Sequence, residues 1–462
     1  MKKLLLLFSA LLILTACSKD DESDFDINKP FVKTTLKRTV LVYISGENNL
    51  SDYIPKQLED MKAGSYNLGN NALVVYVDGT EQNTNVDSAG QKTNLPYIAR
   101  IVDGEMKDSI TLYDEDPLSS DPEVMKRIID FAFFHYPAEE YGLVLWGHAN
   151  GWVEGDSAYT PPIPTANKMK RAFGIDNGLN SRYSTQGRWI NTPTLAKVLE
   201  ACQHLKFIFA DCCQFQCIEN AYELRNTVDY IIASPAEIPG EGAPYNLVVP
   251  CMFDPTATFY EKMADAYFSQ VTSFNYIVSD EDGWVSTNYG IFKSQVPLSV
   301  VKTVQLEPLA TATRTLMGLL FPDTLTTFPN LERRDLIYYY GNVLKPNENM
   351  MYDMNDVLLS LSNEKGVTYE YIQWKEMFDK AVIYRLYPHN GQGWTTNKQV
   401  HPKVFNYLSD ERYGGVSMYF PQNRTNTWYS RYEAYIDKLA WYHAIHQQPD
   451  TTTTINHSEQ PF

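Results

Sequence analysis

The sequence predicts an α/β protein with a mostly parallel central sheet, and three features of the chain support this fold class. Several apolar runs of strand length do not alternate with polar residues, as expected of strands covered by helices on both faces. Segments with apolar residues at helical spacing lie between these runs. Two of the runs end abruptly in His148 and Cys213, and parallel strands deliver such groups to the carboxyl edge of a sheet.

The first part of the chain predicts two strands joined by a helix. Residues 39–45 are a β-branched and aromatic run that stops at Gly46, which favours a strand. Cap residues then open a predicted helix over about 49–61, and a second continuous apolar strand follows over 72–78. This order of strand, helix and strand implies a right-handed crossover.

The next elements lead to the first strand end. Residues 94–113 predict irregular strands or a hairpin, and apolar residues at helical spacing predict a helix over 121–136. The strand that ends at His148 follows directly. Residues 157–188 are then polar and rich in Pro, Gly and Asn, and a loop of this length is uncommon unless it is functional.

The second strand end has a similar arrangement. A helix over 192–202 precedes the strand 205–213, and a helix over 216–226 leads away from it. Another buried strand is predicted over 228–234. Turn residues follow it at 239–242, again at the carboxyl edge of the sheet.

The chain beyond residue 254 is dense in aromatic residues, which we interpret as packing. Elements are predicted there as helices over 260–268, 300–319, 352–361 and 425–446, and as a strand over 415–420. The predicted divisions are a signal peptide (1–16), a flexible acidic tether (17–36), an α/β domain with both strand ends (37–253), a mixed helical and strand extension of the same fold (254–446) and a disordered tail (447–462).

The N-terminus predicts export and lipidation. Lys2 and Lys3 precede an apolar run over 4–14, which is too short for a membrane-spanning helix and typical of a signal peptide. The run ends in a segment that resembles a bacterial lipobox, so Cys17 is expected to be acylated and to anchor the mature chain. The acidic residues 18–22 favour an outer-membrane lipoprotein exposed at the cell surface. The alternative is an ordinary signal peptide with a coincidental cysteine.

Charge and cysteine usage limit the classes of partner and of site. A formal net charge of -17 argues against binding to nucleic acid, which needs clusters of Lys and Arg. No membrane span is predicted in the mature chain, so membrane contact is expected only through the lipid anchor. With Cys17 acylated, five cysteines remain, and an odd number leaves at least one thiol without an internal partner. Cys202 and Cys217 are predicted either to form a disulfide or simply to pack.

The two strand ends suggest nucleophilic catalysis. A thiol attacks a peptide carbonyl as thiolate, so Cys213 as nucleophile needs a base such as His148, which titrates near neutral pH. Backbone N–H groups of Cys213 and Ala149 are expected to meet the oxyanion. The alternatives are a structural histidine and an inert buried cysteine. Cys212 is a rival nucleophile, although neighbours on a strand point to opposite faces. No close-spaced ligand pair supports a zinc site.

The same stretches resemble the clostripain-like cysteine peptidases, a family of the caspase-like clan. The family's Trp-x-His-Gly-x-Gly-Trp is matched by Trp-Gly-His-Ala-Asn-Gly-Trp at 146–152. Its Asp-Ala-Cys-Leu-Met is matched by Asp-Cys-Cys-Gln-Phe at 211–215, and the family's next motif, a Glu and Ala-Tyr-Glu-Leu, by Glu219 and 221–224. This register identifies Cys213 as the nucleophile. Further matches lie at 42–50, 233–245, and 415–421 with Trp441, so the resemblance covers about 38–443.

The resemblance implies a fold, an activity and further site residues. The fold would be a caspase-like three-layer α/β/α sandwich, and the activity would be cleavage of peptides or proteins after Arg or Lys. Asp211 and Glu241 would bind the basic side chain, because carboxylates pair well with a guanidinium. Self-cleavage in the loop after the histidine would fall at Lys168, Lys170 or Arg171. No cofactor is expected; some relatives need calcium, and the chain has no EF-hand-like ligand run that would decide for it, so a calcium requirement stays open.

One departure from the family pattern keeps a second function open. Ala149 stands where the family has Gly, and a position that needs a positive φ would be strained by Ala. A member degraded in this way would be a catalytically inactive surface lipoprotein that binds a peptide or protein partner in its cleft. A glycan-binding lipoprotein is a third alternative, and it predicts clustered exposed Trp, whereas the aromatic residues here lie in core-like runs.

Overall fold

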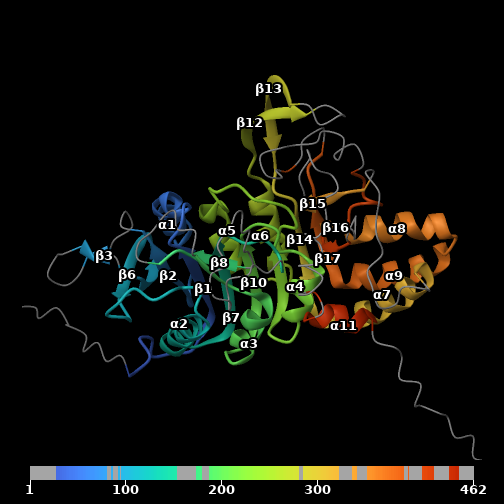
Figure 1. The fold of residues 1–462 in the computed structure, drawn as a ribbon. Helices are drawn as coiled ribbons and strands as arrows, with labels where there is room; N and C mark the ends of the chain where they lie inside the picture. Colours follow the sequence, from blue (N-terminus) through green and yellow to red (C-terminus); the bar gives the residue numbers. More distant parts are fainter. Residues whose placement is uncertain are drawn as a thin grey trace, which may run out of the picture.

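A nine-stranded sheet forms the centre of the computed structural model (Figure 1). The structure describes residues 28–80, 85–86, 92–93, 95–152, 173–178, 187–279, 285–321, 336–340, 351–389, 394, 408–420, 436 and 438–446. The signal peptide, Cys17, the loop residues Lys168, Lys170 and Arg171, and the tail therefore lie outside the described residues.

Five neighbouring strands at the middle of the sheet run parallel, which confirms the predicted α/β class. In spatial order they are β11 (Val228–Ala233), β10 (Leu205–Asp211), β7 (Ala138–Gly147), β1 (Leu36–Gly46) and β2 (Asn71–Gly79). All five end at the same edge of the sheet, because parallel strands share one direction. This edge holds the residues singled out from the sequence.

Antiparallel strands extend the sheet on both sides. β5 (Tyr97–Val102) and β6 (Glu105–Ile110) follow β2, and they correspond to the predicted hairpin. β14 (Leu298–Lys302) and β17 (Val382–Leu386) lie beyond β11. The sheet therefore continues into the part of the chain that follows residue 254.

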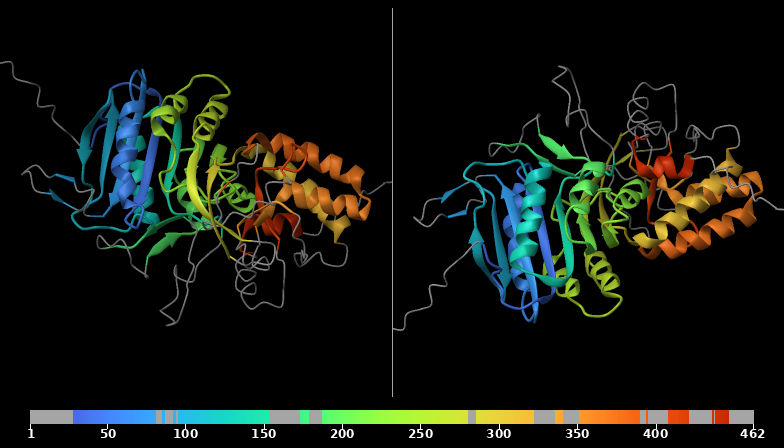
Figure 2. Two further views of the ribbon diagram at one scale, coloured as in Figure 1. Left: turned by 90° about the horizontal axis from the view of Figure 1, so that it is seen from above. Right: turned by 90° about the horizontal axis from the view of Figure 1, so that it is seen from below.

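Helices cover both faces of the sheet, which gives the three layers (Figure 2). One face carries η1 (Ser51–Tyr53), α1 (Ile54–Gly64), α5 (Tyr245–Met252) and α6 (Phe259–Phe268), and the other carries α2 (Pro122–His135), α3 (Thr192–Glu200) and α4 (Ile218–Glu223). Side chains of β1 alternate between the two cores: Tyr43 belongs to the core with α2, and Val42 and Ile44 to the core with α1. A continuous apolar strand is the sequence expected for such a position.

The C-terminal part adds a helical layer and a small sheet beyond α4 (Figure 1). Its elements are η3 (Thr303–Gln305), α7 (Leu306–Leu320), α8 (Met354–Lys365), α9 (Thr368–Ala381), α11 (Ala440–His446), β15 (Tyr338–Tyr340), β16 (Met351–Asp353) and β18 (Ser417–Tyr419). The remaining strands form pairs: β3 (Asn85–Val86) with β4 (Lys92–Thr93), β8 (Phe173–Asp176) with β9 (Arg188–Ile190), and β12 (Thr272–Ser279) with β13 (Val285–Ser294).

One predicted helix is wrong at its start. Residues 300–302 belong to β14 and not to a helix, and α7 begins only at Leu306. Leu298, Val300 and Val301 are buried between β11 and β17, where branched side chains pack well on a pleated surface. Residues 352–353 are likewise strand, because they pair with β18, and Asp353 caps the helix that follows by accepting a hydrogen bond from the Asp356 N–H.

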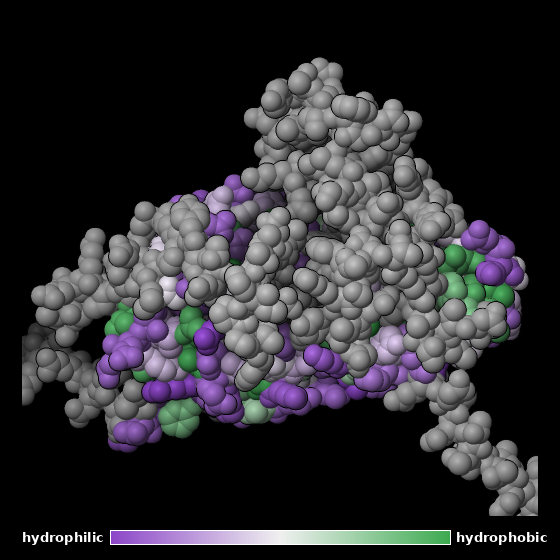
Figure 3. Space-filling view, in the orientation of Figure 1, coloured by the Kyte–Doolittle hydropathy of each residue, from purple (hydrophilic) through white to green (hydrophobic). Residues whose placement is uncertain are grey.

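The structure bears on two expectations from the sequence, one about membrane spans and one about the pairing of cysteines. Among the described residues, no helix combines the length and the apolar character that crossing a bilayer requires. The face shown in Figure 3 is mostly hydrophilic where residues are coloured. None of the five cysteines in the described ranges forms a disulfide, so Cys202 and Cys217 pack rather than pair.

Candidate active site

The two predicted strand ends meet in space because of the register of the sheet. Trp146 of β7 pairs with Asp211 of the adjacent parallel strand β10. His148 lies two residues beyond Trp146, and Cys213 lies two residues beyond Asp211. The two residues therefore leave neighbouring strands at the same level of the carboxyl edge, where ligand and catalytic sites of α/β sheets are found.

A third residue comes from the next strand of the sheet. Asn49 follows β1, which pairs with β7 on the side away from β10. Its Oδ1 lies 2.7 Å from Nε2 of His148, and the Trp189 ring lies 6.4 Å from the imidazole, centroid to centroid. With an amide oxygen as acceptor, Nε2 carries the proton of the neutral ring and Nδ1 is the basic nitrogen. From the sequence, Asn49 was predicted as part of a helix start and of the matched stretch 42–50; its position three residues after the end of β1 was the available signal.

The structure separates the two adjacent cysteines. Cys212 has no exposed surface, and burial, followed by the charges of Cys213 and Asp211, raises the pKa of its thiol well above the usual value. Cys213 is partly exposed, and the Ile238 N–H donates to its Sγ at 3.4 Å. The Sγ can in turn donate to the Ile238 carbonyl at 3.8 Å.

The chain turns sharply after Cys213. Gln214 has a φ of +56°, one of four positive values at non-glycine residues in the described ranges, and its N–H donates to the Ala236 carbonyl at 2.8 Å. A left-handed conformation costs a non-glycine residue about 1–2 kcal/mol, and such strain is often found at functional sites. The turn leaves Cys213 between the end of β10 and the segment that leads to α4.

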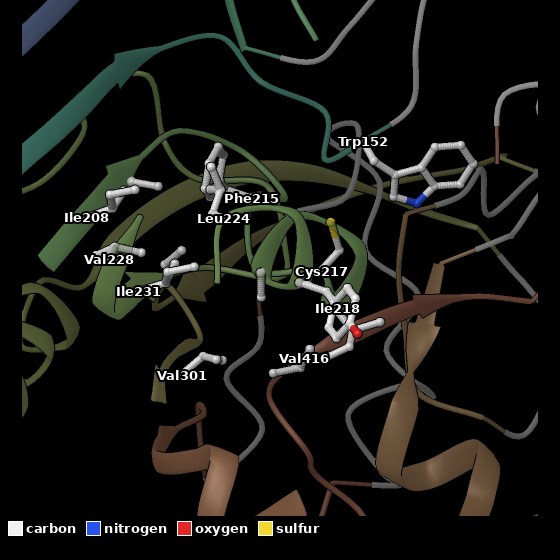
Figure 4. Close-up of a cluster of buried hydrophobic side chains, with 14 of the residues drawn as sticks. Trp152, Ile208, Phe215, Cys217, Ile218, Leu224, Val228, Ile231, Val301 and Val416 are labelled. Atoms are coloured by element: carbon white, nitrogen blue, oxygen red, sulfur yellow. The ribbon is translucent and has the colours of Figure 1, made fainter. Parts of the chain in front are cut away.

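Buried packing holds the segment that follows the turn. Figure 4 shows Trp152, Cys217, Ile218 and Val416 in one cluster of buried side chains. Cys217 forms a β-bridge with Ser417, and the indole of Trp152 lies 5.4 Å from the ring of Tyr419, centroid to centroid. The C-terminal strand β18 thus braces the segment that presents Cys213.

Ala149 does not have the backbone conformation that would strain an alanine. It is not among the described non-glycine residues with positive φ. It forms an antiparallel bridge with Phe173 of β8, and the adjacent hydrogen bond runs from the Gly174 N–H to the His148 carbonyl at 2.8 Å. The physical reason for suspecting an inactive chain is therefore missing.

The two acidic candidates lie together but in different environments. Asp211 is buried and accepts hydrogen bonds from the Ala243 N–H and the Tyr245 hydroxyl at 2.9 Å and from the Tyr267 hydroxyl at 3.0 Å. Burial raises its pKa to about 6, although these hydrogen bonds oppose the rise. Glu241 is exposed on the adjacent turn.

The turn that carries Glu241 passes directly over the Asp211 carboxylate. A Cβ added to Gly242 would lie 2.7 Å from Asp211 Oδ2. The Gln57 side chain of α1 also donates a hydrogen bond to the Glu241 carbonyl. The structure therefore brings one buried and one exposed carboxylate to the same corner of the edge.

A further group of carboxylates lies beyond the end of β1, where the sequence did not predict a site. Glu47, Asp78 and Asp116 come from three separate segments, and their ligand atoms lie within 4.8 Å of one another. No spacing in the sequence signals such a group, because the sheet and not the chain order assembles it. Among the described residues, these three carboxylates form the group that could hold a metal ion.

Comparison with known proteins agrees with the geometry of this edge. The model of Peptidase_C11, the clostripain family, matches residues 42–449. Clostripain from Hathewaya histolytica is 23% identical over 227 residues, which span 46% of this chain and 41% of clostripain. The match thus covers less than half of that relative.

Solved structures of two bacterial proteins are similar over nearly their whole length. A secreted C11 cysteine protease from Bacteroides thetaiotaomicron, in complex with an irreversible peptide inhibitor, is 28% identical with a TM-score of 0.62, covering 88% of this chain and 98% of that one. An inactive zymogen C11 protease from Parabacteroides distasonis is 26% identical with a TM-score of 0.58. The similarity covers 90% of this chain and 100% of that one. Because the family model spans most of its length, the chain belongs to the clostripain family of cysteine peptidases.

Proposed function

We propose that the chain is a cysteine endopeptidase that cleaves after Arg or Lys, with Cys213 as nucleophile and His148 as general base and acid. The observation that carries the proposal is the pairing of Trp146 with Asp211. Because of this pairing, His148 and Cys213 follow adjacent strands at the same level of the sheet. The partial exposure of Cys213, in contrast to the buried Cys212, supports the choice of thiol.

The proposed reaction follows from these positions. His148 takes the proton of the Cys213 thiol, and the sulfur forms a bond to the peptide carbonyl carbon. The carbon–nitrogen bond then breaks as His148 returns the proton to the leaving amine. Water, activated by the same imidazole, hydrolyses the acyl-enzyme. Backbone N–H groups of Cys213 and Ala149 would stabilise the oxyanion, and Asn49 would hold the ring in one orientation.

Specificity for a basic side chain is proposed for the corner formed by Asp211 and Glu241. A guanidinium pairs strongly with a carboxylate that is shielded from water. The close approach of Gly242 to Asp211 supports the idea that the two acidic residues serve one pocket. Glu241 is exposed and would meet an incoming side chain.

A thiol-reactive probe that carries an arginine side chain tests the dyad. We expect the probe to label Cys213, the adduct to be absent in His148→Ala, and labelling to persist in Cys212→Ala. Peptides with Arg or Lys before the scissile bond should be cleaved, and matched peptides with a neutral residue should not. If the protein neither reacts with the probe nor cleaves Arg peptides, yet binds them, it is the inactive surface lipoprotein instead.

Self-activation is proposed for the loop between Trp152 and β8. Both ends of this loop are held, because Trp152 is buried and Phe173 is bridged to Ala149. The similarity to a protein described as an inactive zymogen supports the idea that the intact chain must be processed. We propose cleavage after Lys168, Lys170 or Arg171.

Processing can be followed on pure protein. The wild-type chain should convert into two fragments during incubation, and Cys213→Ala should remain intact. Replacement of Lys168, Lys170 and Arg171 together by Ala should also block conversion, whereas replacement of the exposed Lys365 should not. An active preparation that remains a single intact chain would refute self-activation while leaving the dyad in place.

A further inference from the structure

The ring of Trp189 lies beside the proposed general base. Its centroid is 6.4 Å from that of the His148 imidazole, and the two ring planes are tilted by 50°. Trp189 is partly exposed, whereas Ile190, the next residue of β9, is buried in the core that α2 and α3 cover. Because side chains alternate along a strand, the indole points away from this core, and the imidazole of His148 lies on its side.

Backbone pairing ties the strand of Trp189 to the strand end that carries His148. β9 pairs with β8, and Phe173 of β8 is bridged to Ala149. The Gly174 N–H of the same strand donates a hydrogen bond to the His148 carbonyl at 2.8 Å. The indole therefore keeps its place beside the imidazole.

The stretch that follows β9 is tied to the segment of the proposed nucleophile. The Thr192 hydroxyl, at the start of α3, donates a hydrogen bond to Asn220 Oδ1 at 2.8 Å. The Asn220 amide donates to the carbonyl of Phe215, two residues beyond Cys213, at 3.2 Å. Trp189 thus has a fixed position relative to both members of the proposed dyad.

The indole of Trp189 is held by its strand and not by a hydrogen bond. Its Nε1 is buried and has no hydrogen-bond acceptor within the described residues, although a buried indole usually donates to a partner. The ring can therefore adjust to a neighbouring group without losing a hydrogen bond. A partly exposed aromatic ring in this position offers a substrate a large apolar contact area.

The chemistry of the proposed reaction decides which part of a substrate meets Trp189. His148 returns its proton to the leaving amine, so the residue after the scissile bond lies beside the imidazole. The basic side chain before the bond is assigned to the corner of Asp211 and Glu241, which packs with α1 and α5 on one face of the sheet. β9 packs with the core of the other face. Trp189 therefore belongs to the leaving-group side of the site.

We propose that Trp189 forms the subsite for the residue that follows the scissile bond and selects an apolar side chain there, such as Leu or Phe. This inference rests on the proposed cleavage by Cys213 and His148. Contact with the indole would stabilise the transition state of acylation only, because the leaving segment has departed when water attacks the acyl-enzyme. An apolar contact of this kind changes kcat/KM by about 10-fold or more.

A series of peptides that share one Arg and differ only in the next residue tests the subsite. For the wild type, kcat/KM should be about 10-fold higher with Leu or Phe after the Arg than with Gly or Asp. In Trp189→Ala this ratio should fall to about 1 to 2, whereas Trp189→Phe, which keeps a ring, should retain most of it. The matched control is Tyr369→Ala, which removes a 68% exposed aromatic ring from α9 and should leave the ratio unchanged.

A charged replacement and the arginine probe keep the possible outcomes apart. Trp189→Glu should turn the preference towards Lys after the scissile bond, and it serves if Trp189→Ala does not fold. A wild type that cleaves all peptides of the series equally well, or a Trp189→Ala variant that keeps the full preference, overturns the subsite and leaves the dyad in place. A wild type that neither takes up the probe nor cleaves any peptide refutes the dyad and the subsite together.

Discussion

His148 lies at the end of a strand that is flanked by β1 and β10. Asn49 follows β1 on one side, at a hydrogen-bond distance of 2.7 Å, and Cys213 follows β10 on the other. A base that must take a proton and later return it works best in one tautomer and one orientation. At the scale of single residues, the short polar side chain after β1 is therefore expected to matter as much as the residue types of the proposed dyad.

Asn49→Ala should lower kcat by about 10- to 100-fold and leave KM nearly unchanged, because the ring loses its orientation while the substrate pocket is untouched. Asn49→Asp should restore orientation and favour the imidazolium, which shifts the acidic limb of the kcat/KM profile to higher pH. Steady-state kinetics over pH with an Arg peptide measures both effects. A purely structural Asn49 would instead reduce activity equally in both variants, with an unchanged pH profile.

At the scale of elements, the turn between β11 and α5 packs against the end of β10. The turn at 239–242 places Gly242, with a φ of +64°, against the Asp211 carboxylate. Glycine is required there twice over, for its left-handed backbone and for the close approach. This is a tertiary reason for a residue that in the sequence looks like ordinary turn chemistry.

A pair of glycine variants separates these two requirements. Gly366 at the end of α8 has a φ of +72° but no atom within 4 Å of an added Cβ. Gly366→Ala should therefore cost about 1–2 kcal/mol of stability from backbone strain alone. Gly242→Ala should cost about 2–4 kcal/mol, because overpacking adds to the strain. Urea unfolding of both variants gives the difference, and equal losses would show that the contact with Asp211 is unimportant.

The junction between α4 and β18 contains a buried carboxylate, Glu219. Glu219 accepts a hydrogen bond from the Tyr419 N–H at 2.8 Å, and its other oxygen has no partner in the described chain. Burial raises its pKa from 4.5 to about 7. The unfolded chain therefore releases this proton above about pH 4.5, while the folded chain retains it up to about pH 7. Stability from this group is present below that window and is lost as pH rises through it.

Glu219→Gln should remove this pH dependence. Relative to the variant, the free energy of unfolding of the wild type should fall by up to about 3 kcal/mol between pH 4.5 and 7.5, at about 1.4 kcal/mol per pKa unit. Urea unfolding at several pH values measures the slope. Glu59→Gln, which removes an exposed carboxylate, should leave the slope nearly unchanged. A slope that Glu219→Gln does not alter would place the titrating group elsewhere.

At the scale of the whole molecule, the C-terminal part completes the candidate site. β14 and β17 extend the central sheet, and β18 braces the segment after Cys213 through the bridge of Cys217 with Ser417. Two residues 200 positions apart, Cys217 and Ser417, thus hold the segment that contains the proposed nucleophile. A truncated chain that ends near residue 253 would lose both supports.

We propose that the whole molecule is held at the outer membrane by acylation of Cys17. In bacterial cells, the wild type should incorporate a clickable palmitate analogue and sediment with membranes. Cys17→Ser should lose the label and the membrane association, because the chain would then have no lipid anchor. Cys251→Ser controls for general effects of cysteine loss. A labelled Cys17→Ser protein, or an unlabelled wild type, would contradict the proposal.

Much of the fold was predictable because it depends on local patterns. Continuous apolar runs in the sequence predict the parallel strands, and His148 and Cys213 stand at the ends of two of these runs. Residues 300–302 were mistaken for helix because a short apolar run does not reveal its period, and only pairing with β11 and β17 makes it a strand. The separation of Cys212 from Cys213 followed from strand alternation together with the family register.

By itself, the sequence determined the α/β class and the two strand ends, because both depend on side-chain type and spacing along the chain. Only the tertiary structure decided what surrounds them. The hydrogen bond of Asn49 to His148, the approach of Gly242 to Asp211 and the gathering of Glu47, Asp78 and Asp116 all join residues from different strands and loops. Such contacts depend on strand order and register, which arise when the whole sheet assembles and which no local pattern encodes.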